Sequence, residues 1–276
     1  MEKLEELYSQ FKIDSDNRLD SFKIESIASL SKISEDAYLE KPTWLGGDEK
    51  YVCLFIDLNN SSEISNIKQK STVAKIYDYF TQNVVDVLSI QEISAEYIDI
   101  KGDGVFGLYE GQNAIFKAFV AAITFKTFFQ NEISQKFKSA YEITLSCKLS
   151  MDFDKILVRK IGRRKFYNEV WAGKLVNNTF KLASLDKQIR KIQGIKEEDN
   201  LLIVSETIFT KLKVKEQYAI LSCGHSNDGS SSGDKVNLWK EFTDSEPGSQ
   251  YTSKVFYIPA KWCKLCGDEY LAKILD

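Results

Sequence analysis

Two stretches of the chain run from apolar, strand-forming residues directly into an aspartate. Residues 51–56 are apolar (YVCLFI) and stop at Asp57, and residues 97–103 (YIDIKGD) stop at Asp103. The segment between them reads as a helix, so the two strands can be neighbours in one sheet. A carboxylate just past a buried strand is held rigidly and still reaches solvent. Two such groups can hold hard cations between them, which is what gathering a nucleoside triphosphate and its metal ions requires.

Composition limits what kind of protein this is. With 276 residues, 43% of them hydrophobic, the chain can bury one large core. Its 37 basic and 40 acidic residues give a formal charge of −3, which predicts neither nucleic acid nor a membrane as a partner. No apolar run is long enough to span a bilayer, and the start MEKLEELYSQ lacks the order of a signal peptide. We therefore expect a cytoplasmic protein whose five cysteines stay reduced.

The first 45 residues differ in character from the rest. Apolar residues recur at helical spacing within 4–11 and again within 24–30, and the stretch KPTWLGGDEK then interrupts the pattern. We interpret residues 1–45 as an N-terminal helical arm that packs on the core or on a second subunit, with a frayed tail as the alternative. Residues 46–214 are then the main domain, and residues 215–276 form a short C-terminal extension of strands.

From residue 50 onward, predicted strands and helices alternate. Strands are expected at 51–57, 94–100, 104–109, 142–151, 155–160, 166–171, 200–204, 236–242 and 254–258. Helices are expected from an N-cap near Ser62 through Leu88, at 111–136, at 173–187, and after a cap at Ser205. The composition of 226–234 (SNDGSSSGD) indicates a flexible loop. The pattern predicts an α/β (α+β) sandwich with a mainly antiparallel sheet flanked by helices.

The first of three motifs is FIDLNNSSE, residues 55–63. An aspartate at a strand end, followed by small turn-forming residues, opens a helix here. The backbone N–H groups of the loop and of the helix start can receive phosphate oxygens while Asp57 binds a cation. The candidate substrate-binding positions are Leu58, Asn59, Asn60, Ser61 and Ser62. A strand, aspartate, turn and helix in this order also occur in many α/β proteins without such a role.

The second and third motifs are IDIKGDGVFGLYEG (98–111) and VWAGKLVNNTFKLASL (170–185). Glycines let the second motif turn tightly and present Asp103 at its tip, although a plain hairpin would do the same. In the third motif, Asn177 and Lys181 are four residues apart and share one helical face. An amide and a cation on one face can hold a sugar oxygen and a phosphate, and a solvated polar stripe is the alternative.

Together and in this order, the three motifs resemble the catalytic domain of class III nucleotidyl cyclases over about residues 50–214, including LLIVSETIF (201–209). The resemblance implies the class III cyclase fold and two-metal phosphoryl transfer, in which the ribose 3′-oxygen attacks the α-phosphorus and expels pyrophosphate. Asp57 and Asp103 would hold two Mg²⁺ or Mn²⁺ ions, with the Leu58 carbonyl as a further ligand. One ion would lower the pKa of the 3′-hydroxyl and the other would neutralise the triphosphate.

The resemblance also assigns roles to the third motif. Asn177 would orient the ribose. Lys181 stands where the family has its transition-state arginine, which keeps the charge but loses the bidentate fork, and Arg163, Arg164 or Lys165 could assist it. Active sites in this family form between two subunits arranged head to tail. We therefore expect a homodimer in which one subunit supplies the metal-binding aspartates and the other supplies Asn177 and Lys181.

The substrate is indicated by departures from the family pattern. In purine cyclases of this class, the residue three before the glycine of GD reads the base, as lysine for adenine and glutamate for guanine. Here it is Asp99, and its partner position is Val170, or Glu169 if Ala172 is counted as an insertion. Neither purine code is present.

The form WAGKxVN resembles the pyrimidine cyclases of bacterial Pycsar anti-phage systems. Those stand-alone enzymes make cyclic UMP or cyclic CMP, which activates a separate effector. Because a carboxylate beside the base would accept a hydrogen bond from uracil N3–H, Asp99 favours UTP over CTP. The alternatives are a purine (adenylate or guanylate) cyclase and a catalytically inactive nucleotide-binding regulatory module.

The cysteines form two groups. Cys223, His225, Cys263 and Cys266 have spacing that could close a tetrahedral structural Zn²⁺ site, with thiols that bind no metal as the alternative. Cys53 and Cys147 lie in apolar strands and are expected in the core.

Overall fold

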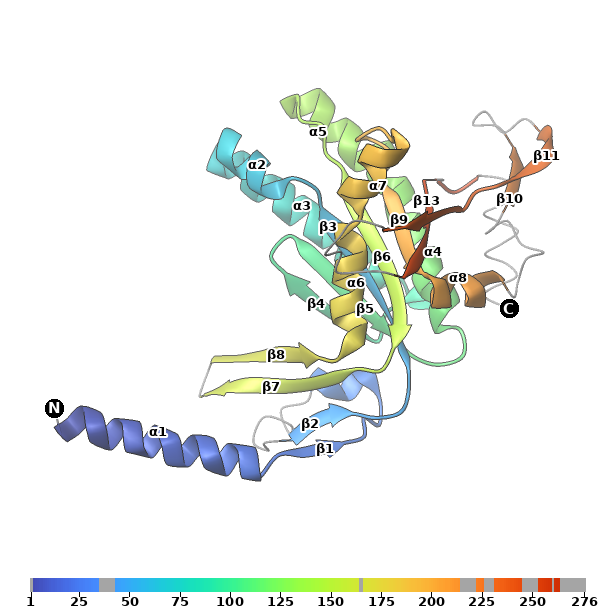
Figure 1. The fold of residues 1–276 in the computed structure, drawn as a ribbon. Coiled ribbons are helices and arrows are strands. Elements are labelled where there is room, and N and C mark those ends of the chain that lie inside the picture. The colour runs from blue at the N-terminus through green and yellow to red at the C-terminus, as the bar shows by residue number, and fades with distance from the viewer. Residues whose placement is uncertain are drawn as a thin grey trace.

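The computed structural model describes residues 2–34, 43–163, 166–213, 222–225, 231–244, 253–259 and 261–263. Its centre is a seven-stranded sheet with the order β12-β13-β9-β6-β3-β5-β4 (Figure 1). Neighbouring strands are antiparallel except β6 and β9, which are parallel. The strands are β3 (Tyr51–Leu58), β4 (Tyr97–Lys101), β5 (Gly104–Tyr109), β6 (Cys147–Asp154), β9 (Leu201–Ser205), β12 (Lys240–Thr243) and β13 (Lys254–Ile258). The expected mainly antiparallel sheet is thus confirmed.

Helices cover both faces of this sheet, because β3 alternates between two cores. Its even-numbered residues from 52 to 58 pack with α3 and α4, and its odd-numbered residues from 51 to 55 pack with α6. The rings of Phe80, Phe125 and Phe129 meet in the first core, with centroids 5.6–5.9 Å apart. The helices are α2 (Ser61–Ile67), α3 (Lys70–Leu88), α4 (Ala114–Phe128), α5 (Ser134–Tyr141), α6 (Lys174–Ser184), α7 (Asp186–Gln193) and α8 (Glu206–Lys213). This is the predicted sandwich.

A second sheet has the order β1-β2-β7-β8, and β10 pairs with β11 separately. These strands are β1 (Lys23–Glu25), β2 (Thr43–Gly46), β7 (Leu157–Arg163), β8 (Phe166–Ala172), β10 (Ser222–His225) and β11 (Ser231–Asn237). Within the described part of the chain, no helix combines the length and apolarity that crossing a membrane requires.

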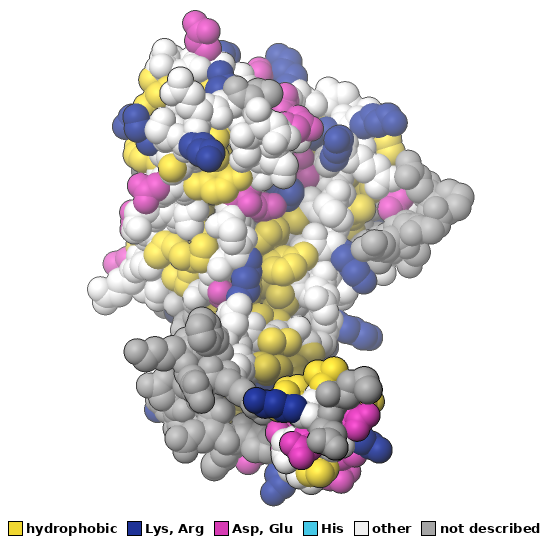
Figure 2. Space-filling model, turned by 90° about the vertical axis from the view of Figure 1, so that its left-hand side faces the viewer, with side chains coloured by type: hydrophobic (Ala, Val, Ile, Leu, Met, Phe, Trp, Pro, Cys, Tyr) yellow, Lys and Arg dark blue, Asp and Glu magenta, His cyan; other side chains and the backbone are white. Residues whose placement is uncertain are grey.

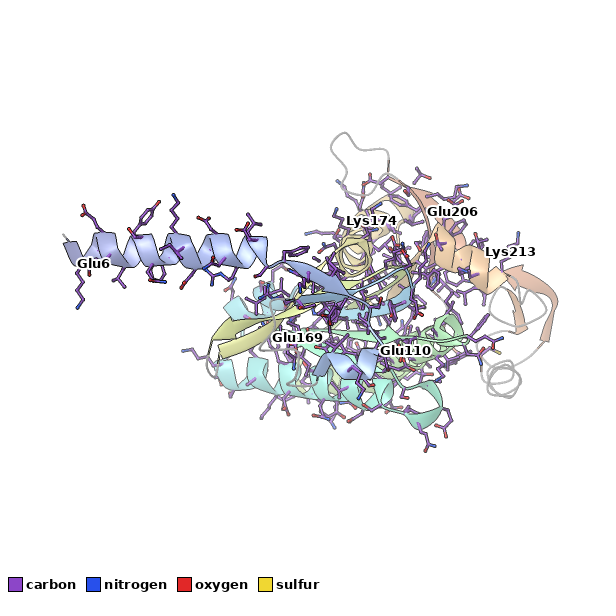
Figure 3. All side chains as sticks on the ribbon, turned by 90° about the horizontal axis from the view of Figure 1, so that it is seen from below. Glu6, Glu110, Glu169, Lys174, Glu206 and Lys213 are labelled. Atoms are coloured by element: carbon purple, nitrogen blue, oxygen red, sulfur yellow. The ribbon has the colours of Figure 1, made fainter. Side chains whose placement is uncertain are left out.

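The N-terminal segment has two parts. Helix α1 (Glu2–Asp20) stands clear of the body, as Figures 1 and 3 show, and its apolar side chains are exposed. Residues 27–33 instead pack into the core behind β4, where Glu110 accepts hydrogen bonds from the Ser29 hydroxyl (2.7 Å) and the Leu30 amide (3.1 Å). The helix that the spacing within 24–30 indicated is wrong. Residues 24 and 25 belong to β1, and Leu30 begins the short 3₁₀ helix Leu30–Ser34.

Several predicted bounds need correction. The helix expected from Ser62 to Leu88 is two helices, because Lys68 is extended (φ −114°, ψ 156°), and Asn60 rather than Ser62 takes the N-cap position. The helix expected at 111–136 is α4, a π-helical turn and α5, and the helix expected at 173–187 is α6 and α7. Strand β6 begins at Cys147 rather than at the predicted residue 142. Residues 231–234 belong to β11 rather than to a loop, and 226–230 lie outside the described residues.

Two local predictions are confirmed. The Ser205 hydroxyl accepts a hydrogen bond from the Ile208 amide (3.3 Å), as an N-cap of α8 does. Strand β13 covers the predicted range 254–258.

Candidate active site

The end of β3 and the β4–β5 turn lie side by side. Antiparallel pairing of β3 with β5 runs to Ile56 and Val105, which places Asp57 next to the turn that carries Asp103. A Cβ atom at Gly104 would lie 2.7 Å from the Phe55 ring and 3.2 Å from Asp57 Oδ1, so only glycine allows this approach. The structure therefore brings together the two aspartates that the sequence singled out.

Electrostatics at this pair suit a cation. Burial raises the pKa of the Asp57 carboxyl, the ammonium of Lys148 opposes that shift, and the nearby charge of Asp103 adds to it. Asp103 Oδ2 is buried and has no hydrogen-bond partner among the described residues. A buried carboxylate oxygen without a partner is costly unless a ligand satisfies it. The residues present thus fit divalent ions held by Asp57 and Asp103.

Lys148 is a candidate site residue that the sequence pattern did not indicate. It lies directly across from Asp57 in the β3–β6 pairing, and its Nζ is 2.9 Å from Asp57 Oδ2. Its side chain keeps 25% of its exposure, so the ammonium can also meet an anion from solvent. The available signal was a lone lysine in the otherwise apolar strand CKLSM, but its facing partner depends on strand register.

The turn after Asp57 is tied to the protein more than expected. Leu58 is buried, the Asn59 amide donates to the Ser146 carbonyl (2.8 Å), and the Asn59 side chain points toward Asp186. The Asn60 side chain donates to Glu197 (3.1 Å). These donors of Asn59 and Asn60 are therefore directed at the protein itself. The side chain of Asn60 does not cap α2, whose first-turn amides at Ser61 and Ser62 have no partner within the helix.

Asp99 lies in a cluster of paired charges between β4 and β8. Its Oδ2 accepts from Trp171 Nε1 (3.2 Å) and pairs with Lys101 Nζ (2.9 Å), which also donates to Asn168 Oδ1 (3.2 Å). Glu169 is hydrogen-bonded to the Tyr97 side chain, and the Tyr97 and Trp171 rings meet at 5.3 Å.

Of the two candidate partners for Asp99, Glu169 contacts this cluster through Tyr97, whereas the Val170 side chain is exposed.

Asn177 and Lys181 share one face of α6, as predicted. Asn177 is exposed and donates to the Gly173 carbonyl (2.9 Å), while the neighbouring Phe180 anchors the helix on Phe55 (ring centroids 4.4 Å apart). No hydrogen bond or ion pair joins Asn177 or Lys181 to Asp57 or Asp103 within the described residues. The structure thus shows no direct polar contact between the candidate metal-binding pair and the α6 pair within the described residues of one chain.

Solved structures of nucleotide cyclases have a similar fold. The guanylate cyclase domain of RhGC from Catenaria anguillulae in complex with GTP matches with a TM-score of 0.55 and 12% identity, covering 78% of this chain and 98% of that one. Other guanylyl and adenylyl cyclase structures match similarly. The chain has the class III nucleotidyl cyclase fold.

Sequence comparison adds two relatives of this cyclase-fold chain. A uridylate cyclase of Propioniciclava tarda is 28% identical over 262 residues, which are 92% of this chain and 74% of the relative. A uridylate cyclase of Micromonospora echinofusca is 26% identical over 231 residues, 82% of this chain and 69% of the relative. No family model matches the chain.

The predicted zinc site of this cyclase-fold chain remains a prediction. Cys266 lies outside the described residues. Of the three cations expected to assist Lys181, Arg164 and Lys165 also lie outside them. Across the described ranges, no group of three or more His, Cys, Asp or Glu side chains gathers to hold a metal. Cys53 and Cys147 are fully buried, as expected for core residues.

Proposed function

We propose that the protein is a pyrimidine nucleotide cyclase that converts UTP to 3′,5′-cyclic UMP and pyrophosphate. The observation that carries this proposal is that Asp57 and Asp103 lie close together at one end of strands β3 and β5, with the buried Oδ2 of Asp103 left without a partner among the described residues. The cyclase fold and the similarity to two uridylate cyclases support it. The product would be a second messenger for a separate effector in bacterial anti-phage defence, made in the cytoplasm.

Asp57 and Asp103 would hold two Mn²⁺ or Mg²⁺ ions, with the Leu58 carbonyl beside them. Bound ions of this kind activate the 3′-hydroxyl and neutralise triphosphate charge. Lys148 adds a positive charge beside Asp57, which would favour binding of the triphosphate in the site. Asn177 would orient the ribose, and Lys181 would stabilise the charge that develops in the transition state.

The cluster around Asp99 supports uracil as the base, through a different group from the one the sequence favoured. Asp99 uses Oδ2 for Trp171 and Lys101, and it is the less exposed partner of its ion pair, at 11% against 34% for Lys101. An ammonium has three donors, and Asp99 and Asn168 take two of them. The third can donate to the O4 carbonyl of uracil, where cytosine carries an amino group that is itself a donor.

We further propose a homodimer with two shared sites. Within the described residues of one chain, no hydrogen bond or ion pair joins Asn177 or Lys181 to Asp57 or Asp103, and a second copy would complete each site. Figure 2 shows exposed hydrophobic side chains gathered in the middle of one face of the molecule. Exposed apolar residues on β4, β7 and β8 are Ile100, Ile161 and Val170. Burying such residues against a second copy would remove apolar surface from water.

Incubation with each of the four nucleoside triphosphates and Mn²⁺, followed by chromatography of the products, tests the function. We expect cyclic UMP to dominate. Cyclic CMP would overturn only the choice of base, whereas cyclic AMP or cyclic GMP would overturn the pyrimidine assignment. If Asp57→Ala kept near-wild-type cyclase activity, the metal assignment would be overturned.

Mixed dimers test the shared site. A chain with Asp57→Ala and a chain with Asn177→Ala should each be inactive alone, and mixing them should restore part of the activity because one intact composite site can assemble. Mixtures that stay inactive, in dimers shown to exchange subunits, would contradict the shared site.

A further inference from the structure

A buried carboxylate that the proposed chemistry does not use lies next to the metal-binding turn. Asp186 is the first residue of α7 and is only 3% exposed. Both of its oxygens are held by Arg190, through Nε to Oδ2 (2.5 Å) and Nη2 to Oδ1 (3.2 Å). A buried ion pair of this kind adds little stability, since the cost of removing both charges from water offsets their attraction. Its position invites a functional explanation.

Asn59 connects this ion pair to the turn after Asp57. Its Nδ2 lies 3.3 Å from Asp186 Oδ2 and 3.3 Å from Ser146 Oγ, and its amide donates to the Ser146 carbonyl at 2.8 Å. Leu58 alone separates Asn59 from Asp57, so the direction of the Asp57 carboxylate depends on where this turn is held. Arg190 also donates to the carbonyls of the loop that follows α7, at residues 196 and 197.

Asp186 is equally close to the helix that carries Asn177 and Lys181. Helix α6 ends at Ser184, and Leu185 alone separates it from α7. The Leu185 amide donates to the Leu182 carbonyl (3.1 Å), and both leucines are buried in one core with Ile189 of α7. Because α6 and α7 pack as one unit, a shift of Asp186 would also move the exposed face of α6.

We propose that Asp186 is a positioning residue that, through Asn59 and Arg190, clamps the metal-binding turn to the α6–α7 unit. In a shared-site dimer, each subunit gives its metal-binding turn to one active site and Asn177 and Lys181 to the other. The clamp would therefore connect the two sites. The first part requires only that Asp57 and Asp103 bind a divalent ion. The second part, coupling between sites, rests on the proposed homodimeric cyclase.

A Mn²⁺ binding titration without nucleotide tests the clamp independently of activity. Electron paramagnetic resonance measures the concentration of free Mn²⁺ at each point of the titration. We expect Asn59→Ala and Asp186→Asn to weaken Mn²⁺ binding about tenfold, the usual scale for residues that orient metal ligands. The double variant should be no weaker than the worse single one, because both remove one interaction. The control is Gln188→Ala on the same helix, which removes a hydrogen bond to Asp244 (2.8 Å) instead.

Asp186→Asn leaves Arg190 without its ionic partner and can unfold the chain, so Asn59→Ala carries the test. Unchanged Mn²⁺ affinity in folded Asn59→Ala protein overturns the clamp. An equal loss in Gln188→Ala also overturns it, since the effect would then be a general loosening of α7. If the unaltered protein binds no Mn²⁺, the metal site is wrong and the clamp falls with it.

The mixed dimer tests the coupling. Its intact site takes the metal-binding turn from the Asn177→Ala chain and Asn177 from the Asp57→Ala chain. Adding Asn59→Ala to the Asp57→Ala chain leaves every metal ligand of that site untouched. We expect kcat at saturating Mn²⁺ to fall about fivefold, and an unchanged kcat would overturn the coupling. A mixed dimer inactive before this addition would instead refute the shared site, and the Mn²⁺ measurement would still decide on the clamp.

Discussion

Replacing Lys148 by methionine should change nucleotide binding and metal binding in opposite directions. Methionine keeps most of the side-chain length and apolar stem, so the strand packing of β6 is largely preserved. What disappears is the ammonium 2.9 Å from Asp57 Oδ2. Toward the triphosphate this ammonium is an attraction. Toward a free divalent ion it is a competitor, because it pairs with the carboxylate that the ion needs.

The size of both effects follows from the geometry. Two unit charges about 4 Å apart interact by about 4 kcal/mol at the effective dielectric constant of a protein surface. Both side chains keep part of their exposure, 25% for Lys148 and 18% for Asp57, so solvent reduces this to about 1–2 kcal/mol. That corresponds to about a tenfold change. We expect the KM for UTP to rise about tenfold and the affinity for Mn²⁺ alone to increase several-fold.

Pyrophosphate release gives the KM, and electron paramagnetic resonance of free Mn²⁺ gives the metal affinity. Lys155→Met is the matched control, because Lys155 pairs with Asp48 at an exposed position. The reasoning fails if UTP and Mn²⁺ affinities move in the same direction in Lys148→Met, or if Lys155→Met behaves like it.

Three further predictions concern other groups. Lys101→Met should lower the selectivity for UTP over CTP about tenfold, because a donor to the uracil carbonyl is lost; equal selectivity would contradict Lys101 as the base-reading group. Burial lowers the pKa of Lys126 to about 7 from its ordinary 10.5, so between these pH values the unfolded chain holds more protons and stability rises with pH. Urea unfolding at pH 7 and pH 9 should show a rise in the free energy of unfolding of about 2 kcal/mol that Lys126→Met, compared at the same two pH values, does not show. Zinc measured by atomic absorption should be present in the purified protein and be lost in Cys263→Ser; metal-free unaltered protein would refute the zinc site.

Features that depend on neighbouring residues could be predicted from the sequence. The alternation of β3 between two cores follows from its apolar pattern, and the position of Asp57 at its end follows with it. Gly102, which has a φ of +69°, and Gly104, which has no room for a side chain, specify the tight turn that presents Asp103. The N-cap at Ser205 is equally local.

Features that depend on partners far along the chain could not. Lys148 faces Asp57 only because β6 pairs with β3 in one register, and a shift of one residue would turn it to the opposite face. The sequence left Glu169 and Val170 as alternatives, and the pleat of β8 put Glu169 beside Tyr97. The sequence made Asn59 a candidate substrate-binding residue, and only the position of α7 showed that Asp186 lies within hydrogen-bonding distance of its side chain. Local spacing determined which residues end strands and form turns, whereas packing between distant elements decided which charges meet, because side chains so far apart in the chain contact each other only through the tertiary fold.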